Sequence, residues 1–144
     1  MIKSKYNAKK IKIGPYDFDS VTEGRYYSEV ILTNLNLIKS FRVHPTYQLQ
    51  EPFRKYDKSF KAITLEADFE VIYNDGRKIV IDIKGQALPL ALVKKKLFDY
   101  KYPETKLQWL CMSKMDGGWI SFDMLKAARK IRKAIKKKAQ VLKK

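Results

Sequence analysis

The stretch from Leu65 to Gly85 limits the possible folds of this chain more than any other, because it holds two apolar runs around a turn signal. β-branched and aromatic residues dominate both runs, as half-buried strands require. Asn74-Asp75-Gly76 separates them, and Gly76 can adopt the positive φ that a hairpin needs. The sequence therefore predicts a β-hairpin. The charged residues set into this hairpin are Glu66, Asp68, Glu70, Asp82 and Lys84.

The length of the turn decides whether Asp68 and Asp82 meet. A two-residue loop would place Asp68 opposite Ile83 and turn Asp82 to the other face, because a slip of one residue exchanges the faces. A three-residue loop, Asn74-Asp75-Gly76, places Asp68 opposite Asp82 and Glu66 opposite Lys84. We predict the three-residue loop, since Gly76 can provide the left-handed residue that closes it. The other face is then apolar and carries Phe69, Val71, Ile79, Ile81 and Ile83.

Two carboxylates facing each other across adjacent strands repel unless one is protonated or a cation lies between them. Mg²⁺ takes oxygen ligands, and a neighbouring lysine can orient or help to deprotonate an attacking water. Asp68, Asp82 and Lys84 are therefore suited to metal-assisted phosphodiester hydrolysis. The spacing alone is equally compatible with a solvated hairpin face on which Glu66 pairs with Lys84.

The charge of the chain indicates a polyanionic partner. Its 144 residues fit one domain, and 31 Lys and Arg against 15 Asp and Glu give a net charge of +16. Such an excess favours nucleic acid through counterion release. We expect a single domain, residues 1–144, with a basic N-terminal arm (1–12) and a basic C-terminal helix (121–144). That helix could follow phosphates, be a solvated tail, or lie on a membrane surface, although few bulky apolar residues follow Ile135.

The remaining elements can be placed along the chain. Ser20 and Glu23 form a capping box that begins a helix from Val21 to about Lys39. Phe41 to Gln50 is predicted to be an edge strand interrupted by Pro45, and Glu51 to Lys61 a polar connection that is either a DNA-contacting loop or an exposed hairpin tip. A helix follows Pro89, with its apolar stripe on Leu90, Val93, Leu97 and Tyr100. Lys106 to Met112 is a strand, Met115 to Gly118 a loop, and the last helix begins at Phe122 with an apolar stripe of its own.

Three further residues, Glu23, His44 and Cys111, can be explained by structural roles alone. Glu23 is either only a helix cap or a third acid near Asp68 and Asp82, with Glu29 as the second candidate. His44, the single histidine, is interpreted as a surface or strand-end residue. Cys111 is the single cysteine and is expected to be buried, which excludes a disulfide within the chain. No run is long and apolar enough for a membrane span and no signal peptide follows Met1, so a cytoplasmic location is expected.

Together these motifs resemble the PD-(D/E)XK nuclease superfamily. The segments Phe18-Asp19-Ser20-x-x-Glu23, Ala67-Asp68-Phe69, Asp82-Ile83-Lys84-Gly85 and Lys94-Lys95-Lys96-Leu97-Phe98 are similar to small phage-encoded nucleases related to Holliday-junction resolvases. The resemblance covers roughly residues 18–112. It implies an α/β fold with a restriction-endonuclease-like core, a central mixed β-sheet flanked by helices.

The resemblance also implies roles for individual residues. Asp68, Asp82, the carbonyl of Ile83 and Glu23 would hold Mg²⁺ or Mn²⁺, and Lys84 would orient the water. Two departures stand out: Asp82 replaces the commoner Glu, and Lys96 precedes Tyr100 where several related exonucleases have Gln. We therefore expect Lys96 to contact phosphate. The full set of expected DNA contacts is Lys94, Lys95, Lys96, Arg129, Lys130, Arg132 and Lys133.

The implied function is a metal-dependent endonuclease for branched DNA, most simply a phage Holliday-junction resolvase. It would work as a homodimer in the host cytoplasm, since a junction offers two symmetric strands. A nuclease for flaps, ends or duplex sites is an alternative within the superfamily. A non-catalytic basic nucleic-acid-binding protein is an alternative of another class, and it would need the lysines but neither Asp68 nor Asp82.

Overall fold

A central five-stranded sheet organises the protein, whose computed structural model describes residues 9–143. The strands lie in the order β11-β10-β9-β8-β3, with β9 and β10 parallel and the other neighbours antiparallel. Their bounds are β3 Ile38–Val43, β8 Phe69–Tyr73, β9 Lys78–Ile83, β10 Lys106–Ser113 and β11 Gly118–Ser121. The predicted α/β class with a central mixed sheet flanked by helices is therefore confirmed. Residues 1–8 of the expected N-terminal arm lie outside the described part of the chain.

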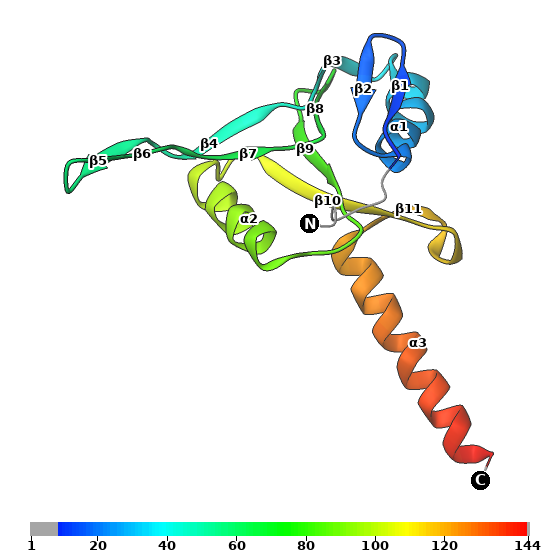
Figure 1. Cartoon of the computed structure of the whole chain (residues 1–144). Coiled ribbons are helices and arrows are strands. Elements are labelled where there is room, and N and C mark those ends of the chain that lie inside the picture. The colour runs from blue at the N-terminus through cyan, green and yellow to red at the C-terminus, as the bar shows by residue number, and fades with distance from the viewer. Residues whose placement is uncertain (1–8, 144) are drawn as a thin grey trace.

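Helices cover both faces of this sheet (Figure 1). On one face lies α1 (Val21–Tyr26), which continues as a π-helical turn (Tyr27–Ile31) and a 3₁₀ turn (Leu32–Asn34) and packs against the small hairpin of β1 (Ile11–Ile13) and β2 (Tyr16–Phe18). On the other face lies α2 (Pro89–Lys101), which begins at Pro89 as predicted. Each helix covers its own apolar cluster, so the sheet has a core on both sides.

The β8–β9 hairpin has the predicted register. Phe69 lies opposite Ile81 and Val71 opposite Ile79. The amide of Tyr73 donates to the carbonyl of Arg77 across the three-residue loop, and Gly76 has a φ of +91°. The predicted apolar face packs into the core under α1.

A long two-stranded ribbon continues from the sheet, and we call its residues 46–66 the β-finger. It consists of β4 (Thr46–Gln50) paired with β7 (Ile63–Glu66), followed by β5 (Phe53–Lys55) paired with β6 (Lys58–Phe60) at its far end (Figure 1). The amide of His44 donates to the carbonyl of Asp68, and that of Ala67 to Pro45. These bonds carry the ladder from β3–β8 into β4–β7, so the ribbon bends at His44, whose φ is +53°.

The structure corrects the predicted boundaries before and within this ribbon. The first helical segment ends at Asn34 and not near Lys39, because Ile38 pairs with Tyr73 in the sheet. The predicted strand from Phe41 to Gln50 is divided at His44 and Pro45. Its first part belongs to β3, an edge strand of the central sheet, and its second part is β4, which lies outside that sheet. Of the two alternatives for Glu51 to Lys61, the exposed hairpin tip is confirmed.

The apolar stripe predicted for α2 is wrong at three of its four positions, since only Leu97 packs against the core. Leu90, Val93 and Tyr100 are exposed, while Phe98 is buried. Lys94 and Lys95 lie half-buried on the inner face instead of projecting outward. The Nζ of Lys95 lies 5.9 Å from the centre of the Trp109 ring and 2.9 Å from Asp99 Oδ2, so an aromatic face and a carboxylate hold its charge.

The C-terminal part differs from its prediction in two respects. Residues Gly118–Ser121 form a strand rather than the end of a loop and a lead into the helix. The final helix α3 (Phe122–Leu142) does begin at Phe122, but of its apolar stripe only Leu125 is buried, and Ile131 and Ile135 remain exposed as the helix projects from the body (Figure 1). Cys111 is buried, as predicted. No helix among residues 9–143 combines the length and hydropathy needed to cross a bilayer.

The turn that sets the hairpin register gives a stability test. Gly76→Ala should lower the free energy of unfolding by about 1–2 kcal/mol, because a Cβ is disfavoured at its positive φ. Gly85→Ala is the matched control, since Gly85 has no positive φ and open space around its Cβ position. Chemical denaturation of both variants checks this, and equal stabilities would contradict the turn.

Candidate active site

Glu23 is held at the start of α1 by a modified capping box. Ser20 Oγ accepts a hydrogen bond from the amide of Glu23 at 3.1 Å, which confirms the predicted N-cap. The Glu23 carboxylate accepts from the amide of Asp19 at 3.2 Å instead of from Ser20. This interaction leaves Glu23 8% exposed, and burial raises the pKa of Glu23 above its usual range.

Asp68 is close enough to both Glu23 and Asp82 to experience their charges. The hairpin register places Asp68 and Asp82 across adjacent strands, and the amide of Ile83 donates to Asp68 Oδ2 at 2.6 Å. Loss of hydration raises the pKa of Asp68 well above its usual range, and the negative charges of Asp82 and Glu23 add to the effect. Three carboxylates from separate segments therefore share one electrostatic environment.

Lys84 neutralises only one of these acids. Its Nζ lies 2.7 Å from Asp82 Oδ2 and 5.4 Å from the centre of the Trp109 ring. The alternative pairing of Glu66 with Lys84 is wrong, because Glu66 lies opposite Thr46 in the β-finger. Among the described residues Asp68 has no ion pair with a basic side chain, so only a proton or a bound cation can compensate its charge.

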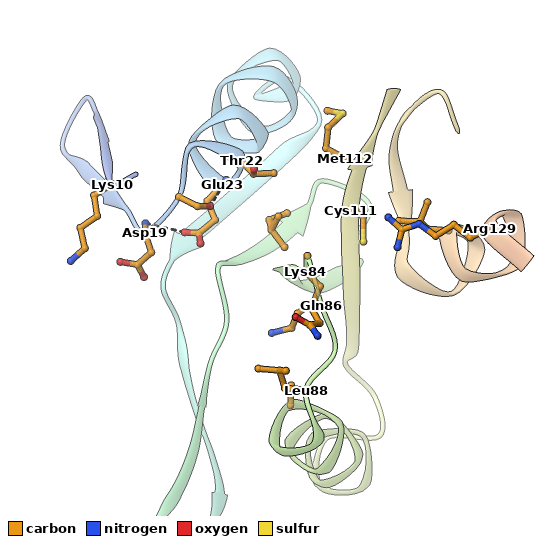
Figure 2. Close-up of a pocket in the computed structure, with 15 residues that line it drawn as sticks. Lys10, Asp19, Thr22, Glu23, Lys84, Gln86, Leu88, Cys111, Met112 and Arg129 are labelled. Atoms are coloured by element: carbon orange, nitrogen blue, oxygen red, sulfur yellow. Dashed lines mark hydrogen bonds between the residues drawn. The ribbon is translucent and has the colours of Figure 1, made fainter. Parts of the chain in front are cut away.

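A groove of about 920 Å³ opens beside these residues. Figure 2 shows Asp19 and Glu23 on its α1 side, Lys84 and Gln86 at the end of β9, and Arg129 from α3 beyond them. A second hollow of about 250 Å³ shares the Lys84 side chain with the groove. It is lined also by Asp82, Glu66, Lys94 and Trp109. Glu23 thus lines the groove and Asp82 the second hollow, while Lys84 lines both.

Sequence reasoning missed two residues beside Glu23. Ligand atoms of Asp19, Glu23 and His44 all lie within 4.8 Å of one another. His44 Nε2 is 3.6 Å from Glu23 Oε2, and this buried nitrogen has no hydrogen-bond partner among the described residues. The predicted strand-end position of His44 is correct, but its side chain turns inward. The Pro45 that breaks the strand was the one local signal for this position.

The other acids considered from the sequence lie differently. Glu29 forms an exposed ion pair with Arg25 at 2.9 Å and accepts from the indole of Trp119, so it is engaged away from Asp68. Glu70 is buried on β8, where burial alone would raise its pKa, but hydrogen bonds from Arg42 and Tyr47 lower the pKa overall. Glu66 is exposed at the rim of the second hollow.

The expected DNA-contacting cations are not equivalent. Arg132 is held by both carboxylate oxygens of Asp116, at 2.6 and 3.2 Å, and Lys95 is paired with Asp99 at 2.9 Å. Arg129 lines the groove and Lys94 the second hollow. The exposed members of the set are Lys96, Arg129, Lys130 and Lys133.

Comparison with known proteins gives one family. Residues 3–117 match the family described as "Protein of unknown function (DUF1064)", whereas no curated protein matches the chain. The matched region contains all the acids of the groove together with Lys84. It ends before β11 and α3.

The proton on Asp68 should make stability depend on pH. Because the pKa of Asp68 is raised in the folded state, its contribution is complete below about pH 4 and is lost as pH rises through the folded pKa. Between pH 5 and 8, with a chelator present, the wild type should lose stability by up to about 1.4 kcal/mol per pH unit. Asp68→Asn should flatten this dependence, and Glu66→Gln should not. Denaturation at several pH values checks the slope; parallel curves for the wild type and Asp68→Asn would contradict it.

Proposed function

The chain belongs to the DUF1064 family, and we propose that it is a divalent-cation-dependent DNA endonuclease with a restriction-endonuclease-like core. Its proposed substrate is branched DNA, in particular a four-way junction. The carrying observation is the grouping of three carboxylates with Lys84, although they come from segments up to 61 positions apart in the sequence. Asp68 experiences the charges of Glu23 and Asp82, and Asp82 is paired with Lys84. A buried acid such as Asp68, which has no basic partner among the described residues, is costly, and this cost favours a functional reason for its position.

The donor set fits a hard cation. Asp68, Asp82, Glu23 and the carbonyl of Ile83 offer only oxygen, the ligand type that Mg²⁺ and Mn²⁺ take. Asp68 supports this proposal, because no basic side chain among the described residues pairs with it and a bound cation could replace its proton. A bound Mg²⁺ or Mn²⁺ would supply a Lewis acid and lower the pKa of water.

The protein's own groups have separable tasks in this proposal. Lys84, fixed by Asp82 and the Trp109 ring, orients the attacking water. Arg129 and Lys94 line the two openings and attract the phosphate backbone on either side of the acids. The resemblance to the superfamily implies that hydrolysis would invert the configuration at phosphorus and leave a 5′-phosphate.

The overall charge and the symmetry of the substrate support the remaining parts of the proposal. A net charge of +16 favours DNA as the partner. A four-way junction has two equivalent strands to cut, so we propose a homodimer that presents two grooves.

The test is cleavage of labelled four-way junction, flap, duplex and single-stranded DNA with Mg²⁺. The wild type should cut the junction in preference to the other substrates. Asp82→Asn and Lys84→Ala should reduce the cleavage rate by several orders of magnitude. Both variants should still bind DNA, because neither substitution removes a proposed contact with the DNA phosphates. Preferred cutting of flaps or duplex would reassign the substrate, and normal cleavage by Asp82→Asn would refute the assigned site. DNA binding without any cleavage would favour a non-catalytic binding protein.

Glu23 has both a structural and a proposed chemical role, and Glu23→Gln separates them. Gln still accepts the hydrogen bond from the Asp19 amide. The free energy of unfolding should therefore change by less than the roughly 0.5–2 kcal/mol that the loss of a helix cap costs. The missing charge should reduce cleavage by about two orders of magnitude or more and raise the Mg²⁺ concentration required.

Glu29→Gln is the matched control, because Glu29 lies on the same helical segment but pairs with Arg25. It should cut normally. If Glu23→Gln also cuts normally across a Mg²⁺ titration, Glu23 is only a cap.

A further inference from the structure

The end of the β-finger is built from exposed residues. All six residues of β5 and β6 are exposed, and the rings of Phe53 and Phe60 stack on each other at 4.7 Å between centres. A cross-strand aromatic pair stiffens a hairpin. The finger therefore projects as a supported ribbon although β5 and β6 pair only with each other (Figure 1).

The basic residues of this end have no acidic partners. Arg54, Lys55 and Lys58 form no ion pair with a carboxylate in the part of the chain that the structure describes. Lys55 lies directly opposite Lys58, and like charges at facing positions destabilise a hairpin. An anion near both lysines would remove this repulsion.

The tip carries an aromatic ring in a strained turn. Tyr56 and Asp57 have φ values of +52° and +55°, where Asn and Gly are the favoured residues. Tyr56 is 77% exposed, and its ring contacts the cation of Lys55 at 4.9 Å. A strained turn that presents a large exposed ring is unexplained by folding and indicates a binding role.

The geometry points to the β-finger as a second DNA contact, with Lys55 and Lys58 on the phosphate backbone and the Tyr56 ring stacked on an unpaired or unstacked base. Aromatic rings bind bases through their faces in a sequence-tolerant way. Such bases occur at branch points and at single-stranded regions, not within a continuous duplex. This inference rests on the proposed function and adds the structural feature of the substrate that the protein reads.

The finger is connected directly to the groove. Leu65 and Glu66, at its base, line the second hollow together with Asp82 and Lys84. Tyr56 and Leu65 are nine positions apart, and at ~3.3 Å per residue the extended strand reaches up to about 30 Å. That is close to one turn of B-DNA, so one substrate can contact both places.

Charge complementarity selects nucleic acid over a second copy of this chain. Residues 53–61 carry Arg54, Lys55, Lys58 and Lys61 against Asp57. Copies of a chain with a net charge of +16 repel each other at such a surface, whereas a phosphate backbone attracts it.

The experiment measures DNA binding by full-length protein carrying Asp82→Asn, in chelator, with fluorescence anisotropy on a four-way junction and on a continuous duplex of equal length. Adding Tyr56→Asn should weaken junction binding by about 5- to 150-fold, the range for one stacked base, and duplex binding much less. Tyr56→Phe keeps the ring and should bind like its parent. Lys55→Gln combined with Lys58→Gln should weaken binding to both DNAs. It should also lower the slope of the logarithm of affinity against the logarithm of salt concentration by about one for each lysine.

Structural readouts keep these outcomes distinct. Asn tolerates the positive φ, so Tyr56→Asn should unfold at the same or a higher temperature than its parent. Junction binding unchanged by Tyr56→Asn, or weakened equally for junction and duplex, would overturn the stacking role. A changed oligomeric state in size-exclusion chromatography with light scattering would assign the tip to association between copies and overturn it also.

Different results would overturn the DNA contact of the finger and the nuclease activity. Selective junction binding that depends on Tyr56, with no cleavage by the wild type, would keep the finger contact and reject the nuclease. Cleavage by the wild type with Tyr56-independent binding would do the reverse.

Discussion

The register of the β8–β9 hairpin is the constraint on which the rest of the structure depends. A three-residue loop closed by Gly76 places Asp68 and Asp82 across adjacent strands. A slip of one residue would place Asp68 and Asp82 on opposite faces and turn the apolar side chains of one of the two strands away from the core under α1. The apolar core and the candidate site are thus fixed by the same few turn residues, and the core supplies the free energy that holds the acids together.

Local signals in the sequence predicted the elements that local interactions determine. The N-cap at Ser20, the helix start at Pro89 and the hairpin turn each depend on neighbours within a few positions. Ile38 was assigned to a helix because its spacing fits one, but pairing with Tyr73 draws it into the sheet. On α2 the inner face carries Lys95, whose ammonium lies near the Trp109 ring, so hydrophobicity alone misplaced most of the apolar stripe.

The site itself was predictable only in part, for a similar reason. Asp68, Asp82 and Lys84 are related by one hairpin, whose register can be counted from the sequence. His44 reaches Glu23 because the ribbon bends between Val43 and Thr46, and a bend of this kind requires the three-dimensional pairing of both strands. The position of Glu23 over Asp68 likewise depends on how α1 packs on the sheet.

The bend at His44 has a consequence for how this protein can change. Beyond it, β4 to β7 pair within the finger, and only its base contacts α2. Two residues added to each strand at the outer end would move the tip outward by about 7 Å and leave every residue of the groove in register. The length of the finger therefore sets the distance between the acids and the tip, and this distance can change without altering the residues around the acids.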